Sequence, residues 1–85
     1  MIRHSELEDR DLWRALKSGT IRWGGHRGLR IYGRLDCWSG RRMQRRNRVF
    51  FESADGAEKC GYRPCGHCMK EEYRQWNSLR ASLDL

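Results

Sequence analysis

The sequence predicts an α+β fold in which a small, mainly antiparallel sheet of three strands packs against an N-terminal and a C-terminal helix. Apolar residues with helical spacing occur near both ends of the chain, and short alternating runs lie between them. The motif Cys65-Gly66-His67-Cys68 adds a candidate metal site that clamps the sheet to the last helix. A chain of 85 residues has the size of one domain, which we place at residues 1–85.

The first predicted helix covers residues 6–18. Ser5 and Glu8 have the spacing of a capping box, and Gly19 suits the left-handed position that follows a helix. We expect the apolar stripe of this helix to face the core. The stripe consists of Leu12, Trp13 and Leu16.

Three strands are predicted over residues 20–23, 29–32 and 48–51, where apolar and polar residues alternate or aromatic residues cluster. The glycine-rich segment 24–28 is predicted to be the turn between the first two strands. The basic segment 38–47 has no clear periodicity and is predicted to be a loop.

Two further helices are predicted in the last third of the chain. Ser53 suits the N-cap of a short helix over residues 54–60, and Gly61 suits its end. The last helix is predicted over residues 66–80, because its apolar residues recur every three or four positions. These residues are Met69, Tyr73, Trp76 and Leu79.

The positive charge is concentrated in the middle third of the sequence. Residues 20–48 contain nine arginines and one acidic residue, Asp36, whereas the segments on either side are close to neutral. Arginine binds phosphate through a planar pair of donors, so this segregation favours a polyanionic partner over a merely solubilising surface. Neither a phosphate-binding glycine loop nor a hydrolytic triad is evident in the sequence.

The order of these elements, and above all the motif Gly61-Tyr62-Arg63-Pro64-Cys65 with Cys68, resembles the Ada-type metal-binding domain. That family holds zinc with four cysteines and repairs methylphosphotriesters in the DNA backbone. One of its zinc-bound thiolates accepts the methyl group irreversibly. The resemblance covers about residues 8 to 75, and it implies that zinc is the cofactor of this chain.

Carried over to this chain, the resemblance implies zinc ligands at Cys37, Cys65 and Cys68. It also places Gly33 where the family has its first cysteine, the methyl acceptor, so methyl transfer by the family mechanism has no nucleophile. The resemblance does not identify the fourth ligand, and the candidates are Cys60, His67, His26 and water. A chain that has lost the metal is a further alternative. We expect Cys60 to be a buried core residue rather than a ligand.

Three functions follow from these patterns. The first is a zinc-binding module that contacts the phosphate backbone of DNA through Arg34, Arg41, Arg42, Arg45 and Arg46. The second is methylphosphotriester repair with Cys37 as the acceptor, and the third is a protein-interaction module with an acidic partner. We favour the first, and we expect a cytoplasmic monomer that does not enter membranes, since no signal peptide or transmembrane run is evident.

Overall fold

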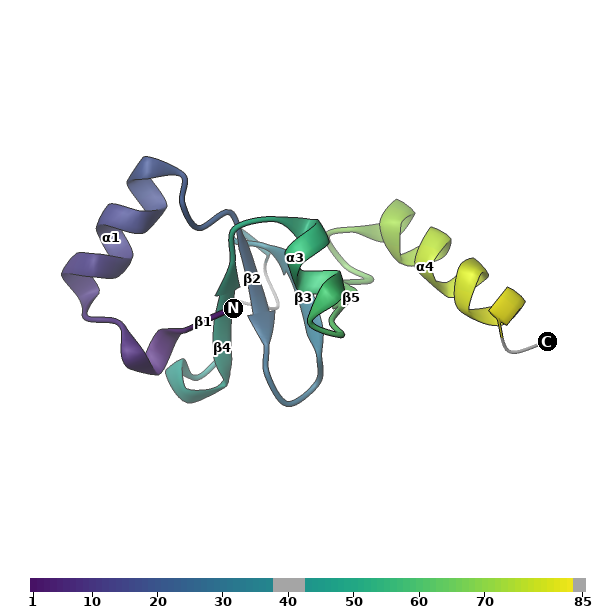
Figure 1. Cartoon of the computed structure of the whole chain (residues 1–85), viewed down its shortest axis with the longest axis horizontal. Coiled ribbons are helices and arrows are strands. Elements are labelled where there is room, and N and C mark those ends of the chain that lie inside the picture. The colour runs from purple at the N-terminus through teal and green to yellow at the C-terminus, as the bar shows by residue number, and fades with distance from the viewer. Residues whose placement is uncertain (38–42, 84–85) are drawn as a thin grey trace.

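The computed structural model describes residues 1–37 and 43–83, with side chains as far as Leu79. A five-stranded sheet occupies the centre, and helices extend from it on both sides (Figure 1). Neighbouring strands are antiparallel, apart from the parallel pair β3 and β5 at one edge. In order across the sheet, the strands are β1 (Ile2–Arg3), β4 (Arg48–Phe51), β2 (Trp23–His26), β3 (Ile31–Arg34) and β5 (Arg63–Pro64).

The α+β class is confirmed, but the sheet has two more strands than we predicted. Both additional strands, β1 and β5, are edge strands of two residues, which are too short to show an alternating pattern. Pro64 is tolerated in β5 because an edge strand can lack an N–H donor. The chain holds β5 against β3 through Arg63 N to Arg30 O at 2.8 Å and Cys65 N to Tyr32 O at 2.7 Å.

The hairpin of β2 and β3 is shifted along the chain relative to our prediction. Gly24 and Gly25 lie within β2, and the turn consists of residues 27–30, with Arg30 in the left-handed region at φ 58°. A β-carbon on Gly25 would lie 3.0 Å from the backbone oxygen of Ile31 and 3.1 Å from side-chain atoms of Val49 and Phe51. This glycine therefore serves close packing rather than a turn.

One face of the sheet carries the hydrophobic core, which α3 (Ala54–Lys59) helps to cover (Figure 1). The predicted cap of this helix is confirmed, because Gly56 N donates to Ser53 Oγ at 3.0 Å. Gly61 follows the helix with a φ of 87°, as its predicted role requires. The core cluster consists of Tyr32, Val49, Phe51, Ala57, Tyr62 and Met69.

Helix α1 (Asp9–Ser18) departs most from our prediction, because none of its residues is buried and it lies away from the sheet (Figure 1). Trp13, which we assigned to the core, is 60 % exposed and packs under Lys17 instead. The core face of the sheet is closed by α3, Tyr62 and Met69 instead of by α1. The predicted capping box does not form, since a 3₁₀ turn (His4–Glu6) precedes the helix. Gly19 does end it, with a φ of 80°.

Helix α4 (Lys70–Leu83) begins beside β5 and projects from the opposite end of the molecule (Figure 1). Tyr73 and Trp76 stack on each other in its first turns, whereas Leu79 is exposed. A second 3₁₀ turn (Arg45–Asn47) leads into β4. Within the residues described, no helix has the length and apolar character needed to span a membrane.

Candidate metal centre

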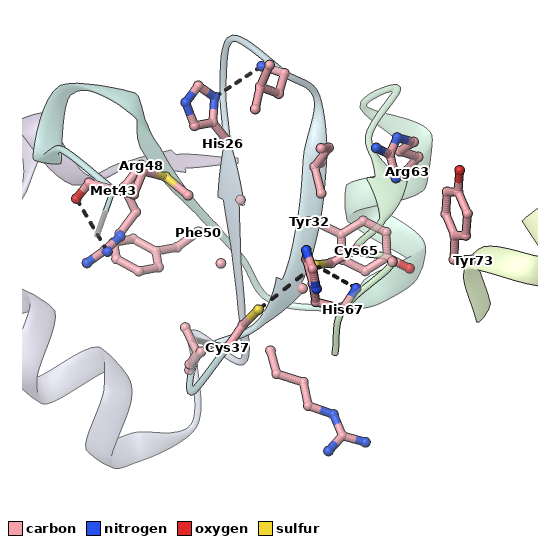
Figure 2. Close-up of a pocket in the computed structure, with 18 residues that line it drawn as sticks. His26, Tyr32, Cys37, Met43, Arg48, Phe50, Arg63, Cys65, His67 and Tyr73 are labelled. Carbon is pink, nitrogen blue, oxygen red and sulfur yellow. Dashed lines mark hydrogen bonds between the residues drawn. The ribbon is translucent and has the colours of Figure 1, made fainter. Parts of the chain in front are cut away.

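Three cysteine side chains meet at the β3–β5 edge of the sheet. Figure 2 shows two of them, Cys37 and Cys65. Cys65 directly follows β5, Cys68 lies in the turn before α4, and Cys37 follows a turn at the end of β3, where Cys37 N donates to Arg34 O at 3.1 Å. Their sulfurs lie within 4.8 Å of one another, and none of them forms a disulfide. The fold thus brings together the three cysteines that the sequence predicted as ligands.

The distances and burial of this cluster suit zinc. Ligands about 2.3 Å from a tetrahedral zinc ion lie about 3.8 Å from one another. The sulfurs of Cys37 and Cys65 are 3.9 Å apart, and both side chains are buried. A set of converging thiols is also the donor chemistry that zinc prefers. The cluster therefore fits a zinc ion without rearrangement of the strands that carry it.

Two backbone N–H groups point at the sulfurs. Arg34 N donates to Cys68 Sγ at 3.3 Å, and His67 N donates to Cys65 Sγ at 3.4 Å. Burial raises the pKa of the Cys68 thiol to about 12, and the Arg34 N–H opposes this effect only in part. A bound dication would lower this pKa, because it stabilises the thiolate directly. The Cys68 thiol is therefore suited to a metal and poorly suited to exist as a free thiolate.

Gly33 lies directly against the cluster. A β-carbon on this residue would be 2.8 Å from Cys68 Sγ and 3.0 Å from Cys65 Cβ. A side chain at position 33 would therefore point into the space that the sulfurs share. The absence of a side chain lets Cys65 and Cys68 pack directly against β3.

The protein residues considered as a fourth ligand lie outside the cluster, which has three members in the described part of the chain. Cys60 is exposed at the end of α3, so our prediction that it is a core residue is wrong. The Nδ1 atom of His26 accepts a hydrogen bond from Leu29 N at 3.0 Å within its own turn. His67 is exposed, and it interacts with the cluster through its backbone N–H.

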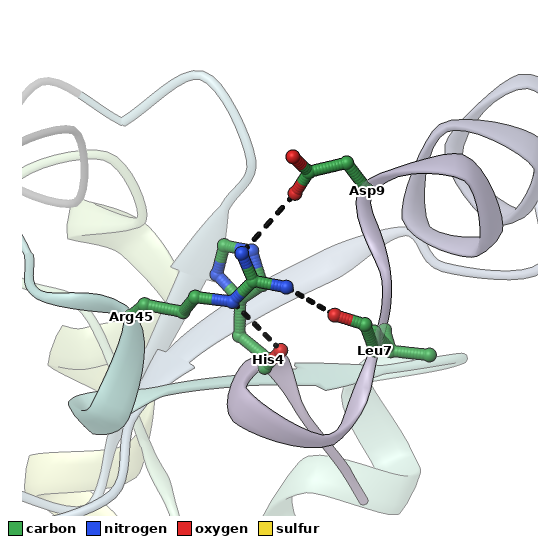
Figure 3. Close-up of polar contacts among 4 residues, drawn as sticks. All are labelled: His4, Leu7, Asp9 and Arg45. Atoms are coloured by element: carbon green, nitrogen blue, oxygen red, sulfur yellow. Dashed lines mark hydrogen bonds and ion pairs between the residues drawn. The ribbon is translucent and has the colours of Figure 1, made fainter.

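The arginines predicted to contact DNA are placed in different surroundings. Arg34 and Arg46 are exposed, and Arg34 also lies beside the cysteine cluster through its backbone. Arg41 and Arg42 fall outside the described residues. Arg45 turns toward the N-terminal segment, where it binds the carbonyl oxygens of His4 and Leu7 and the carboxylate of Asp9 (Figure 3). The predicted role of Arg45 in DNA binding stays a prediction.

A cavity of about 520 Å³ opens on the sheet face beside the cysteines (Figure 2). Its lining includes Arg48 and Arg63, two arginines that were not among the predicted DNA contacts. They are distant in sequence, and only the register of the strands brings them to the same face. The sequence could have placed Arg48 and Arg63 on a common face only if the pairing of the strands had been predicted correctly.

Comparison with protein families matches residues 13–71 to the family described as the metal binding domain of Ada. This match covers more than half of the chain and includes all three clustered cysteines. Searches of curated proteins and of solved structures found no match.

Proposed function

Because the chain belongs to the family of Ada metal-binding domains, we propose that it is a zinc-binding module that binds the phosphate backbone of DNA without transferring a methyl group. Zinc binding is supported by the family and by the cluster of Cys37, Cys65 and Cys68. One observation carries the DNA proposal. The backbone of Arg34 donates to a clustered sulfur, while its side chain is exposed, so the metal site and the cationic surface meet at one residue.

The charge distribution supports a backbone-binding role. Residues 20–48 carry nine arginines and one acidic residue, and the described arginines Arg22, Arg27, Arg30, Arg34 and Arg46 are exposed. In this segment, Arg45 forms an ion pair with Asp9. Phosphate contacts of this kind position a protein on DNA and carry little sequence information. We therefore expect binding that is weakly selective and strongly dependent on salt.

The proposal that methyl transfer is absent rests on the cluster itself. Position 33, which points at the sulfurs, is a glycine and offers no nucleophile. Cys37 is 8 % exposed, so an alkyl group on DNA would have limited access to its sulfur. Intact-protein mass spectrometry after incubation with DNA containing methylphosphotriesters tests this point. We expect no added methyl group, and a methyl group on Cys37 would contradict the proposal.

DNA binding is best tested through its salt dependence. Each phosphate contact contributes about 0.9 to the slope of log K against log salt for duplex DNA. We expect the double variant Arg34→Gln/Arg46→Gln to lose affinity and to have a slope that is smaller by about one to two. The matched control is Arg14→Gln/Arg74→Gln, which removes the same charge from exposed positions on α1 and α4.

The two double variants have the same net charge, so general electrostatic attraction affects them equally. Equal losses in both would mean that no specific surface around the metal centre binds DNA. An affinity that does not change with salt would exclude phosphate contacts as the basis of binding. Either result would overturn the DNA part of the proposal and leave zinc binding untouched.

A further inference from the structure

The register of the sheet places three basic side chains in one row on the face opposite the core. His26 pairs with Ile31 on β3 and with Arg48 on β4, and Ile31 pairs with Arg63 on β5. Residues paired across neighbouring strands point to the same face. Four adjacent strands thus present Arg48, His26, Ile31 and Arg63, in that order, to the cavity that all four line.

The next row on this face, two residues along each strand, consists of Phe50, Gly24 and Gly33. Residues two apart in a strand are separated by about 7 Å. Gly24 leaves its backbone uncovered on this face, whereas the space over Gly33 is taken by the cysteines. A β-carbon built on Gly33 would lie 2.8 Å from Cys68 Sγ and 3.0 Å from Cys65 Cβ, at which the row ends. The cavity therefore extends from the basic row toward the cysteine cluster.

The opposite face of the sheet has no such space. A β-carbon on Gly25 meets three groups at 3.0–3.1 Å, because the core packs against it. A β-carbon on Gly24 meets only Leu35 Cδ2, at the ordinary contact distance of 3.7 Å. The two adjacent glycines thus mark a filled face and an open face of the same strand.

The lining of the cavity combines apolar and cationic groups. Among the described residues, no carboxylate lines it, whereas His26, Arg34, Arg48, Arg63 and His67 all do. Two of the arginines are held in place: Arg63 lies 4.9 Å from the centre of the Tyr73 ring, and Arg48 donates to Met43 O at 3.5 Å (Figure 2). The apolar part of the lining includes Leu29, Leu35 and Phe50.

We propose that this cavity binds a small organic anion with a flat apolar body. The charged group, a carboxylate, sulfonate or phosphate, lies beside His26 and Arg48, which are paired on neighbouring strands, and the apolar body lies over Gly24 toward the cysteines. The volume of about 520 Å³ falls in the range of small-molecule sites, which is about 300–1,000 Å³. The site is concave and partly apolar, and it shares Arg34 with the surface that we assign to DNA.

A pair of fluorescent probes tests this proposal on the zinc-loaded chain of 85 residues. The anionic probe is 8-anilino-1-naphthalenesulfonate, and the neutral probe is N-phenyl-1-naphthylamine, which has the same ring system without the sulfonate. We expect one bound anionic probe per chain and weaker binding of the neutral one. Arg48→Gln should weaken binding of the anionic probe by about tenfold, because it removes a charged donor to the anion. Arg63→Gln should weaken it less, because β5 lies at the far edge of the sheet from β4. They should leave the neutral probe unaffected.

Gly24→Val tests the location of the site, because its side chain enters the cavity from an extended strand where valine is favoured. We expect Gly24→Val to lower the affinity for both probes by roughly tenfold or more, while the zinc content stays unchanged. Arg27→Gln is the charge control, since Arg27 is exposed in the turn and does not line the cavity. It should bind both probes as the unmodified chain does.

Three results would overturn the proposal. Equal affinity for the two probes would exclude recognition of the anion. If Gly24→Val bound the anionic probe with unchanged affinity, the probe would bind elsewhere. If Gly24→Val did not fold, unchanged affinity in the two arginine variants would lead to the same conclusion. Displacement of the anionic probe by one equivalent of duplex DNA would assign the cavity to the DNA surface instead.

Discussion

A β-carbon added to Gly33 would lie 2.8 Å from the sulfur of Cys68. This relationship makes position 33 the natural place for an additional zinc ligand. We predict that Gly33→Cys adds a fourth thiolate and raises zinc affinity by about tenfold or more, since even outer-shell partners of a metal are worth about 10–100-fold. Competition with a chelator measures the affinity, and the sulfur-to-metal charge-transfer band of the cobalt-substituted protein reports the thiolate count.

Gly33→Ala is the control for this substitution, because it adds the β-carbon without a donor atom. We expect it to weaken zinc binding by crowding Cys68. If Gly33→Cys and Gly33→Ala behaved alike, position 33 would not face the metal.

Substitution of the three clustered cysteines should affect zinc binding and stability far more than substitution of Cys60. We predict that Cys37→Ser, Cys65→Ser and Cys68→Ser each lower the zinc content and the thermal midpoint, because metal binding is coupled to folding. Cys60→Ser should change the free energy of unfolding by less than about 0.5 kcal/mol, as expected for an exposed position. Elemental analysis and thermal unfolding measure both effects. A loss of zinc in Cys60→Ser would mean that this thiol is a ligand after all.

The adjacent glycines of β2 should respond in opposite ways to the same substitution. Gly25→Ala places a methyl group 3.0 Å from Ile31 O and should cost about 1–3 kcal/mol through overpacking. Gly24→Ala enters open space and should be neutral or stabilising by up to about 1 kcal/mol, because alanine restricts the unfolded chain. Urea unfolding of the two variants compares them directly. Similar losses would contradict the assignment of open and filled faces.

Arg45 should fasten the N-terminal segment mainly through carbonyl oxygens. Its guanidinium binds His4 O and Leu7 O as well as Asp9, whose side chain is 90 % exposed. We predict that Arg45→Gln costs roughly 1 kcal/mol, whereas Asp9→Asn costs less than about 0.5 kcal/mol, as is usual for exposed ion pairs. Urea unfolding and hydrogen exchange of residues 1–8 measure the effect. Equal losses would show that the ion pair carries the contact.

His4 should make stability depend on pH. Burial, followed by the nearby charges of Arg45 and Arg48, lowers the pKa of His4 below 6.5, and its Nδ1 is buried without a partner among the described residues. The unfolded chain therefore binds a proton before the folded chain does, so stability from this residue is complete above pH 6.5 and declines as pH falls through the lowered pKa.

His4→Phe removes the titrating group and keeps an aromatic ring against Phe50, whose ring centre lies 5.3 Å from that of His4. The difference in unfolding free energy between this variant and the unmodified chain should therefore shrink or reverse as pH falls below 6.5. A difference that does not change with pH would exclude His4 as the titrating group. The comparison also separates His4 from the zinc ligands, which titrate alike in both proteins.

The sequence allowed prediction of those parts of the fold that depend on local chemistry. The cap at Ser53 and the left-handed glycines at positions 19 and 61 are set by neighbouring residues, and each forms as predicted. A motif and a family resemblance also selected the three cysteines that the fold brings together, and their role as ligands stays a prediction. These features need no knowledge of how distant strands pair.

The rest depends on tertiary structure. A glycine pair such as Gly24-Gly25 predicts a turn when only neighbouring residues are considered. In the structure the pair lies within β2, where the core leaves no room for a side chain at Gly25. The stripe of α1 reads as a core face, although α3 and Tyr62 fill that place in the structure. The basic row of the cavity depends on the register of four strands, which no local pattern specifies.

The parallel pairing of β5 with β3 has a consequence beyond the binding of zinc. Two backbone hydrogen bonds join Arg63 and Cys65 to the neighbouring segment, and a metal on Cys37 and Cys65 would hold the same strands together. If β5 detached, β3 would become an exposed edge with unpaired backbone groups. Such edges promote pairing between chains and aggregation. We therefore expect the ion to protect the protein against self-association, so that zinc depletion limits its solubility as well as its stability.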